Sequence, residues 1–324
     1  MSGTWGIPYQ GSKNGIAEDI IRRLPKGKRF VDLFGGGFAM SHCACYSGKY
    51  DSVLYNEFNP LLPELIKGAI QGYYNYSIFK PKWISREDFH RLKETDGYVK
   101  YIWSFSNGGK EYLFGKDLEP RKKSVHNWVV FGIKDEWIKE NFFDVDKYIV
   151  TDDIRQRRIL WKRYVEIVKK KKGETARVQQ LERLERLQNL QQLQQLERLQ
   201  NLQHLQQLER LERLQNLHIQ QGDYRDYEYQ DGDVVYCDPP YEGTASYGSE
   251  FDHAEFYEWV RTRGFPVYFS SYGISADFKM IWAEGKRSLM SGASQLRNYE
   301  CLYINDKENM DNKNKTGERG GRDI

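Results

Sequence analysis

A tetrapeptide in the C-terminal half of the chain, Asp238-Pro239-Pro240-Tyr241, combines the residues best suited to chemistry. It follows an apolar run at 233–237 with the composition of a buried strand, which predicts that it forms the turn at the strand's C-terminal end. Open α/β sheets bind their ligands at that edge. Two successive prolines remove two backbone N–H groups and stiffen the turn, so its carbonyl oxygens face outward. The tetrapeptide therefore offers a carboxylate, a carbonyl and an aromatic ring on one rigid corner.

This combination suits a planar amine, because Asp238 and the Pro239 carbonyl can accept its two hydrogens while Tyr241 stacks on its ring. An exocyclic amine is a poor nucleophile, since its lone pair is delocalised into the ring. Two acceptors would draw the nitrogen towards tetrahedral geometry and release the lone pair to attack an electrophilic methyl group. Positioning would supply much of the rate, without a covalent enzyme intermediate. A bare Asp-Pro-Pro turn with a surface tyrosine is the alternative.

Two further strands of the expected sheet end in groups that could hold a small molecule. Residues 30–38 indicate a strand that breaks into three glycines, and such glycines let a ligand approach the backbone at the first crossover of a doubly wound sheet. The spacing is not GxGxxG and no Lys-Ser/Thr pair follows, which disfavours a dinucleotide or ATP. The next strand ends at Glu57, and a carboxylate there commonly takes a ribose diol, so an adenosine-type ligand fits. An exposed strand-end acid is the alternative for Glu57.

Taken in order, these motifs resemble the Dam-type family of bacterial and phage DNA adenine-N6 methyltransferases. The resemblance rests on Tyr-x-Gly-x-Lys at 9–13, the strand and glycine turn at 30–37, the acid after the second strand and the late Asp-Pro-Pro-Tyr. It covers roughly residues 7–70 and 218–305. It implies a Rossmann-like α/β methyltransferase core with S-adenosylmethionine as methyl donor.

The resemblance also implies which residues meet this donor. By matching position, they are Tyr9 and Lys13 at the donor's amino-acid end, Asp32, Phe34 and Gly36 near its methionine and sugar, Glu57 at its ribose, and Asp223 at its adenine. The catalytic residues it implies are Asp238, Pro239, Pro240 and Tyr241. One departure is that Phe38 stands where many members have another glycine.

Residues 71–150 are rich in aromatic side chains interleaved with basic ones, and the resembled family places its target-recognition domain here. We expect a mainly helical DNA-recognition insertion, with part of the aromatic content forming its own core. Its candidate DNA contacts are Asn107, Lys110, Arg121 and Lys122. Residues 151–177 indicate a basic helix dense enough to hold a phosphate backbone, with a solvated face as the alternative.

Residues 178–217 contain an unusual repeat in which thirteen leucines, from Leu181 to Leu217, are spaced by three. On an α-helix a step of three falls about 60° short of a full turn, so the leucines would wind round the whole surface, and the spacing also misses the ~3.5 residues of a coiled coil. A 3₁₀ helix would align them, but long runs are uncommon. A triangular solenoid also fits, although the lack of β-branched residues favours an α-helix. Five Glu balance five Arg, so we expect self-association or a spacer role, or a neutral loop expansion, rather than DNA binding.

The 324-residue chain carries 49 basic and 46 acidic side chains, so affinity for nucleic acid must come from local patches. Its length suits a large α/β domain with a smaller insertion. The four cysteines form no Cys-x-x-Cys pair and no histidine is spaced with them as a metal site requires, which indicates reduced thiols, no metal and a cytoplasmic protein. The resemblance implies that the cell is bacterial or phage-infected. The first residues do not have the pattern of a signal peptide, and no apolar run reaches the ~18 residues of a membrane span.

Together these features predict an enzyme, a site-specific DNA methyltransferase that acts on adenine N6 in double-stranded DNA. The core would comprise 1–70 and 218–305, and the polar tail at 306–324 would be disordered. The amine lies inside the duplex stack, so the nucleotide must be flipped out, and the Gly/Ser/Thr-rich loop at 242–250 could close over it. One alternative changes the acceptor to cytosine N4, RNA or a protein amide. Another is a non-catalytic DNA-binding or assembly protein that has kept the fold.

Overall fold

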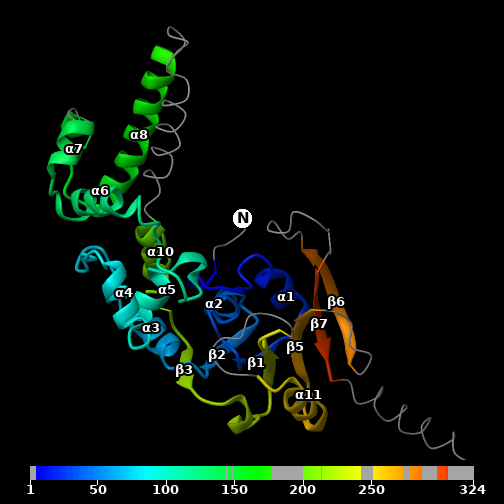
Figure 1. Ribbon diagram of the computed structural model, residues 1–324. Helices are drawn as coiled ribbons and strands as arrows, with labels where there is room; N and C mark the ends of the chain where they lie inside the picture. The colour runs from blue at the N-terminus through cyan, green and yellow to red at the C-terminus, as the bar shows by residue number, and fades with distance from the viewer. Residues whose placement is uncertain are drawn as a thin grey trace, which may run out of the picture. The chain divides into compact units, whose positions relative to one another are not determined.

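The computed structural model describes residues 5–142, 145–147, 149–176, 200–212, 214–241, 251–272, 278–286 and 298–305 (Figure 1). The predicted loop at 242–250, the greater part of the leucine repeat and the tail at 306–324 lie outside these residues.

A seven-stranded sheet has the strand order β3-β2-β1-β4-β5-β7-β6 (Figure 1). Its strands are β1 (Gly27–Asp32), β2 (Tyr50–Glu57), β3 (Leu217–Gln221), β4 (Asp233–Cys237), β5 (Val267–Tyr272), β6 (Lys279–Lys286) and β7 (Asn298–Ile304). The first five are joined by parallel pairings, whereas β7 runs antiparallel to both β5 and β6. The sheet with its helices confirms the predicted α/β class.

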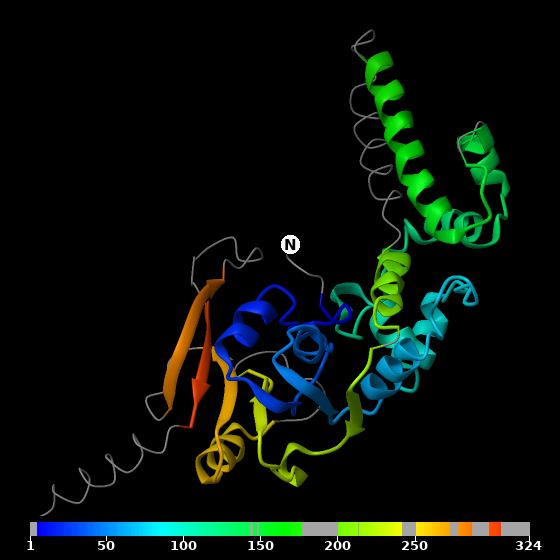
Figure 2. The same ribbon diagram turned by 180° about the vertical axis from the view of Figure 1, so that it is seen from behind.

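Helices cover both faces of this sheet (Figure 2). On one face Ile20 and Met40 pack with Phe30 of β1, and on the other Phe256 packs with Val31 and Phe269. The strand β4 is buried along its whole length, as expected for a parallel strand covered on both sides. The helices that begin in the same segments of the chain as these strands are α1 (Ala17–Arg23), α2 (Ala39–Tyr46), α3 (Leu61–Ile70), η4 (Tyr224–Asp226) and α11 (His253–Thr262).

The strand order reverses beside β1, and this reversal positions the ligand edge. β1 pairs with β2 on one side and with β4 on the other, both in parallel, with Asp32 opposite Tyr55 and Tyr236. The crossovers therefore leave in opposite directions from neighbouring strands, and a crevice for ligands opens at their carboxyl ends. Residues that follow Asp32 and Cys237 must lie at this edge.

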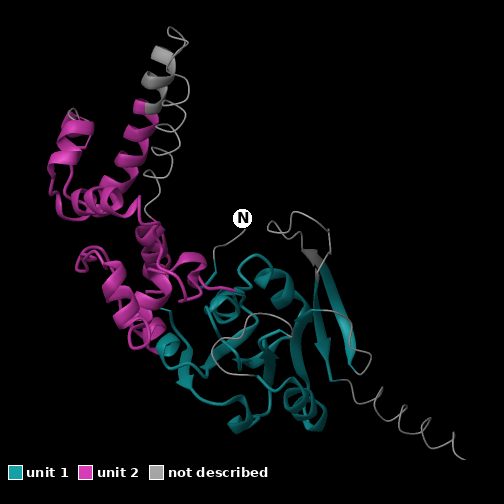
Figure 3. Ribbon diagram, viewed as in Figure 1, with its two compact units in different colours: residues 1–6, 11–63, 214–324 teal, residues 7–10, 64–213 magenta. Residues whose placement is uncertain are grey.

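The chain divides into two compact units, shown in Figure 3: unit 1 comprises 1–6, 11–63 and 214–324, and unit 2 comprises 7–10 and 64–213. Unit 1 contains the sheet. The helices of unit 2 are α4 (Arg86–Leu92), α5 (Gly97–Ile102), η1 (Phe105–Asn107), α6 (Glu119–Phe131), α7 (Glu136–Asn141), η2 (Val145–Lys147), α8 (Ile154–Ala176) and α10 (Gln200–Glu209). Short polar side chains accept a backbone N–H at the start of several helices in both units, namely Ser85, Asp96, Asp135 and Asp252.

Aromatic side chains form much of the core of unit 2. Trp83 stacks on Phe114 and meets Trp103 edge-on, with ring centroids 5.3 and 5.2 Å apart. His126 lies against the same cluster, and burial lowers its pKa to about 4. It is therefore a neutral core histidine, bonded through Nδ1 to the Asn201 side chain at 2.9 Å. These rings are part of the hydrophobic core, as expected for some of the aromatic content.

The described part of the leucine repeat belongs to this core. Residues 200–209 are α-helical, and Leu202, Leu205, Leu208 and Leu211 are all 0% exposed. Three leucines spaced by three, Leu202 to Leu208, cover about 120° of this helix, and Leu211 lies in the turn that follows it, so unit 2 buries one side of the helix. This part of the repeat is α-helical, as the sequence favours, and the helix is short enough that leucines stepping by about 60° all stay on one buried side. Self-association through these particular leucines does not fit their burial.

Polar residues of the repeat fix this helix in place. Glu209 pairs with Arg155 of α8 at 2.9 Å and accepts the backbone N–H of Tyr76 at 2.6 Å. His204 bonds the Ile102 carbonyl at 3.0 Å through Nδ1.

Among the described residues, no helix combines the length and apolarity needed to cross a bilayer.

Replacing Leu205 with alanine should lower the free energy of unfolding by about 2–5 kcal/mol, because a fully buried side chain is lost and a cavity remains. Denaturant unfolding measures the change. The matched control is Gln203→Ala on the exposed side of the same helix, expected within ~0.5 kcal/mol of the wild type. Equal and small effects of both variants would show that this helix is not part of the core.

Candidate active site

Three strands each bring a carboxylate to the same edge of the sheet. Asp32 is the last residue of β1, Glu57 is the last residue of β2, and Asp238 directly follows β4. Because these strands are neighbours and parallel, the acids gather where the strand order reverses. Besides burial, the charges of Asp238 and Glu57 raise the pKa of Asp32, so the three carboxylates interact. The sequence analysis singled out all three, and the sheet brings them together.

Asp32 is the most deeply buried of the three, at 1% exposure. Its Oδ2 accepts the Ser41 hydroxyl at 2.7 Å, whereas its Oδ1 is buried with no hydrogen-bond partner among the residues that the structure describes. Burial raises its pKa to about 7, and the Ser41 hydrogen bond opposes the shift only in part. An unsatisfied buried acceptor costs about 1–3 kcal/mol, and such groups are kept where a ligand satisfies them. Asp32 is therefore suited to receive a donor group from a ligand.

Glu57 holds the glycine turn against the end of β2. Its Oε2 accepts the Gly36 N–H at 2.8 Å and its Oε1 accepts the Asn59 N–H at 3.0 Å. Burial raises the pKa of Glu57, while these two backbone hydrogen bonds oppose the rise. Gly35 is required here because a Cβ would lie 2.1 Å from the Tyr55 ring. The turn thus brings backbone and carboxylate together with no side chain between them.

Phe38 adopts a left-handed conformation, with φ of 67°. This is the position where many members of the resembled family have glycine, and the backbone conformation is one that glycine adopts without strain. The Phe38 ring is 0% exposed and stacks on His42, with centroids 5.9 Å apart. His42 in turn accepts the Gly6 N–H at 3.0 Å. Burial of the ring offsets the strain of the backbone.

A buried network surrounds the carboxylate of Asp238. The Lys13 Nζ lies 2.7 Å from Asp238 Oδ2 and 3.4 Å from Glu300 Oε1. The Tyr241 hydroxyl lies 3.0 Å from Asp238 Oδ1 and also hydrogen-bonds Glu300 Oε1. Its single proton can serve only one of these acceptors at a time. One cation and one hydroxyl thus connect two carboxylates.

Charge within this network keeps Lys13 protonated. Burial alone would lower the Lys13 pKa, but the charges of Asp238 and Glu300 outweigh it, and the pKa is raised above its usual 10.5. Burial and the charge of Glu300 raise the pKa of Asp238, whereas Lys13 and the Tyr241 hydrogen bond oppose this.

The pairing of Asp238 corrects the expectation that its carboxylate is open to a ligand. Both of its oxygens are engaged, because a buried carboxylate without partners would be costly. Each carboxylate oxygen can accept about two hydrogen bonds, so acceptor capacity remains. The side chain is 18% exposed, which leaves one part of it accessible. The Lys13 ammonium lies against Asp238 and Glu300. The predicted contact between Lys13 and a methyl donor stays a prediction.

Two further core residues that were predicted to bind the methyl donor, Asp223 and Phe34, lie on loops that contact each other. Asp223 forms a bidentate pair with Arg225, at 2.9 and 2.6 Å, and this hydrogen bonding lowers the Asp223 pKa. Phe34, directly before the glycines, packs on Tyr224 with centroids 5.0 Å apart. The loop of Asp223 therefore reaches the glycine turn.

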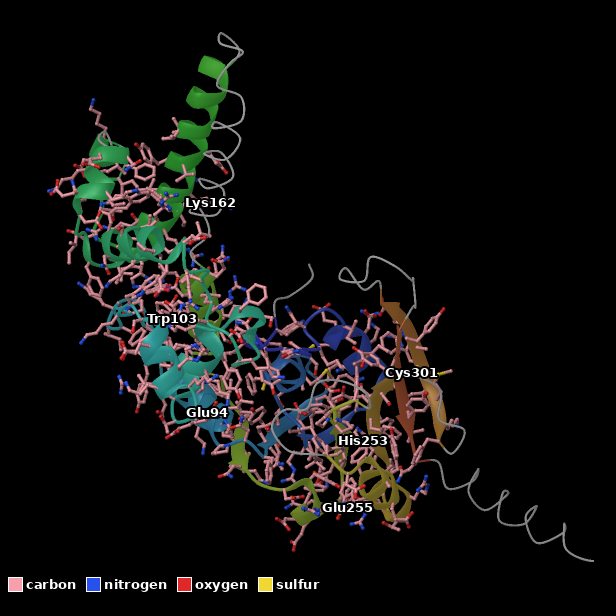
Figure 4. All side chains as sticks on the ribbon, in the orientation of Figure 1. Glu94, Trp103, Lys162, His253, Glu255 and Cys301 are labelled. Carbon is pink, nitrogen blue, oxygen red and sulfur yellow. The ribbon has the colours of Figure 1, made fainter. Side chains whose placement is uncertain are left out.

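The proline corner is supported by a residue that sequence reasoning missed. The Pro240 carbonyl accepts a hydrogen bond from His253 Nε2 at 2.7 Å, and His253 begins α11 (Figure 4). Pro239 is buried beside it. Glu300 was also missed, although an acid within the apolar strand Asn298–Ile304 is a signal that could have found it.

The candidates in unit 2 differ in exposure. Tyr9 packs on Tyr101, with centroids 5.5 Å apart, and Asn107 donates to the Tyr101 carbonyl at 2.8 Å. Lys110 is exposed and Arg121 is half-buried. A DNA contact by Lys122 does not fit the structure, because the residue is 2% exposed with its Nζ 5.5 Å from the centre of the Phe114 ring. The packing of α6 turns this lysine into the core, and a sequence pattern alone does not reveal that rotation.

The fold and this edge define an α/β enzyme that gathers carboxylates where its strand order reverses. A family model described as D12 class N6 adenine-specific DNA methyltransferase matches residues 9–127 and 143–266, which is most of the chain. The chain therefore belongs to this family and is an adenine-specific DNA methyltransferase, as the resemblance predicted. A role in restriction–modification fits the family. A comparison with curated proteins gave no match. Among the described residues there is no group of three or more His, Cys, Asp or Glu placed to hold a metal ion.

Replacing Asp32 with asparagine should stabilise the ligand-free protein at pH 8, by on the order of 2 kcal/mol. Burial raises the folded pKa of Asp32 to about 7, above the ~3.9 of an unfolded chain, so the folded state holds a proton that the unfolded state has lost. The wild type therefore loses stability as pH rises from about 4 to above 7, and asparagine removes that loss.

Urea unfolding between pH 4 and pH 8 measures this effect, and the gain should vanish near pH 4. The matched control is Asp233→Asn, which should destabilise instead, because Arg29 and Tyr227 hydrogen-bond this carboxylate and hold its pKa below the usual range against burial. A gain for Asp32→Asn that does not vary with pH would contradict the account of Asp32.

Proposed function

We propose that this protein transfers a methyl group from S-adenosylmethionine to adenine N6 at a specific site in double-stranded DNA, after flipping the target base out of the helix. Membership of the family gives the acceptor atom and the polymer. What we propose in addition is the identity of the methyl donor, the base-flipping step and the roles of individual residues. The observation that carries it is the meeting of Asp32, Glu57 and Asp238 at the point where the strand order reverses.

The residues at this edge fit the methyl donor. S-adenosylmethionine has a positively charged sulfonium, an ammonium and a ribose diol, and when bound it supplies an electrophilic methyl group. The unpartnered Asp32 Oδ1 suits its cationic end, and Glu57 suits the ribose hydroxyls. Phe34, Gly36 and Asp223 line the same edge. Negative charge from three acids favours a cationic ligand over a phosphate.

Asp238 is the residue that would meet the target amine. Its carboxylate accepts one amine hydrogen, and the Pro239 carbonyl accepts the other. Lys13 stays protonated, and its charge opposes the rise that burial causes in the Asp238 pKa, which favours an ionised acceptor. Tyr241 stacks on the adenine ring. As the nitrogen forms its bond to carbon it becomes more acidic, and Asp238 is the base placed to take the released proton.

Unit 2 would bind the DNA that carries the target adenine. Lys162 (Figure 4) and Arg163 are exposed on α8. Lys110 is exposed in the loop that follows η1. Such side chains suit contacts to phosphate, which position a protein on DNA. Because Lys122 is buried, the proposed surface consists of these residues together with Arg121 and Asn107.

The loop at η1 adds an exposed aromatic ring to this surface. Phe105 is 59% exposed and stands beside Ser106 and Asn107, which have left-handed φ of 53° and 56°. Backbone strain of this kind persists where function requires it, and exposed apolar side chains can insert between DNA base steps. Phe105 is thus a candidate for stabilising the distorted duplex once the base has left it.

Replacing Asp238 with asparagine should reduce the rate of methyl transfer at least ~100-fold, because the amine loses an ionised acceptor. The affinity for the donor should change by no more than a few-fold. Transfer of labelled methyl groups to DNA, with mass spectrometry of the nucleosides, measures the first quantity, and calorimetry measures the second. The matched control is Asp231→Asn, a fully exposed acid before the same strand. Parallel loss of donor affinity and rate in Asp238→Asn would show that this acid belongs to the donor pocket instead.

A further inference from the structure

Glu300 is a buried acid on a strand that the family match does not include. It lies in β7, which pairs with β5 and β6, and it is 0% exposed. The matched residues end at 266, so the strand that supplies this acid is not part of the match. A buried carboxylate costs several kcal/mol unless it is paired. Its partners therefore indicate what it does.

Two of those partners belong to the catalytic corner. The Tyr241 hydroxyl hydrogen-bonds Glu300 Oε1, and the Lys13 Nζ lies 3.4 Å from the same oxygen. Lys13 and Tyr241 are also the two groups that pair with Asp238. Glu300 and Asp238 are therefore linked through the same two groups, the Lys13 ammonium and the Tyr241 hydroxyl.

This arrangement restrains the Tyr241 ring at several points. Its hydroxyl lies between two carboxylates, the Lys13 ammonium lies 4.7 Å from the ring centre, and the Tyr272 ring meets it at 67° with centroids 4.2 Å apart. A tyrosine side chain has two rotatable bonds, so a restrained hydroxyl and a packed ring leave little freedom. A ring held this way loses little conformational entropy when a base stacks on it.

The same arrangement shares one cation between two acids. Lys13 neutralises either Asp238 or Glu300, but not both at once. The charge of Lys13 opposes the rise that burial and the charge of Glu300 cause in the Asp238 pKa, and a charged acceptor forms the stronger hydrogen bond to an amine.

We propose that Glu300 is a positioning residue for methyl transfer, which holds the Tyr241 hydroxyl and the Lys13 ammonium so that the ring and the Asp238 carboxylate are in place before adenine arrives. The inference rests on the proposed roles of Asp238 and Tyr241. Glu300 acts through these residues and needs no contact with DNA or with the methyl donor.

The test compares Glu300→Gln with the wild type in a single-turnover methyl-transfer assay. The change preserves shape and removes the charge, and we expect the rate to fall about 10- to 100-fold, with KM for DNA and Kd for the donor within about threefold. The matched control is Glu284→Gln, an exposed acid directly opposite Glu300 on β6, which should keep the wild-type rate. An inactive wild type would refute the proposed function, whereas an active wild type with an unimpaired Glu300→Gln would overturn this inference alone.

A pH profile separates positioning from a merely structural role. The groups that face Lys13 are Asp238, Glu300, Tyr241 and Tyr272, and the two acids raise the Lys13 pKa. Without the charge of Glu300 this pKa falls, so the alkaline loss of activity should begin at lower pH in Glu300→Gln than in the wild type. A structural glutamate would reduce the amount of active protein without moving that limb of the profile.

A second variant keeps the inference testable if Glu300→Gln does not fold. Tyr241→Phe removes the same hydrogen bond from the other side and keeps the ring, and its rate should also fall about 10- to 100-fold. Where both single variants fold, the double variant should lose no more than the worse single variant, because the two residues act as a unit. A Tyr241→Phe variant at the wild-type rate, or losses that multiply in the double variant, would overturn the inference.

Discussion

The burial of negative charge at one edge of the sheet is the constraint on which the rest of the structure depends. Three acids, Asp32, Glu57 and Asp238, end neighbouring strands, and each is shielded from water. Buried carboxylates repel one another and lose solvation, so each needs a compensating group. Backbone N–H groups compensate Glu57, and the Lys13 ammonium compensates Asp238. Asp32 keeps one oxygen without a partner, and a cationic methyl donor would supply it.

The same constraint explains why distant parts of the chain meet here. Lys13 comes from the segment before α1, Asp238 from the end of β4 and Glu300 from β7. The parallel strands deliver the acids, and the antiparallel strand β7 adds one more behind the catalytic corner. The result is a network in which Asp238 and Glu300 share the Lys13 ammonium.

The sequence predicted the parts of this edge that are local. The proline corner, the glycine turn and Glu57 each have a pattern within a few residues, and their strands are short apolar runs. The family resemblance added Asp32, and the parallel strands of the sheet bring it together with Glu57 and Asp238. The α/β class and the family followed from the same motifs, and both are confirmed.

What the sequence did not predict depends on packing between segments far apart in the chain. Glu300 meets Lys13 only because β7 inserts between β5 and β6, and no local pattern gives that order. Lys122 has the neighbours of a surface lysine in sequence, yet the rotation of α6 buries it. The leucine spacing misses any coiled-coil seam, but α10 is short enough for unit 2 to bury one side of it, so Leu202, Leu205 and Leu208 are core residues, as is Leu211 in the turn that follows.

The most direct test is a crystal structure of the protein with an unreactive S-adenosylmethionine analogue and duplex DNA that contains the unmethylated target site. The account predicts a flipped adenine whose N6 lies about 3 Å from the Asp238 carboxylate, with the analogue against Asp32, Gly36 and Glu57. It also predicts that the Lys13 ammonium remains paired with Asp238 Oδ2. An adenine bound elsewhere, with the Lys13, Asp238 and Tyr241 network closed and unchanged, would contradict it.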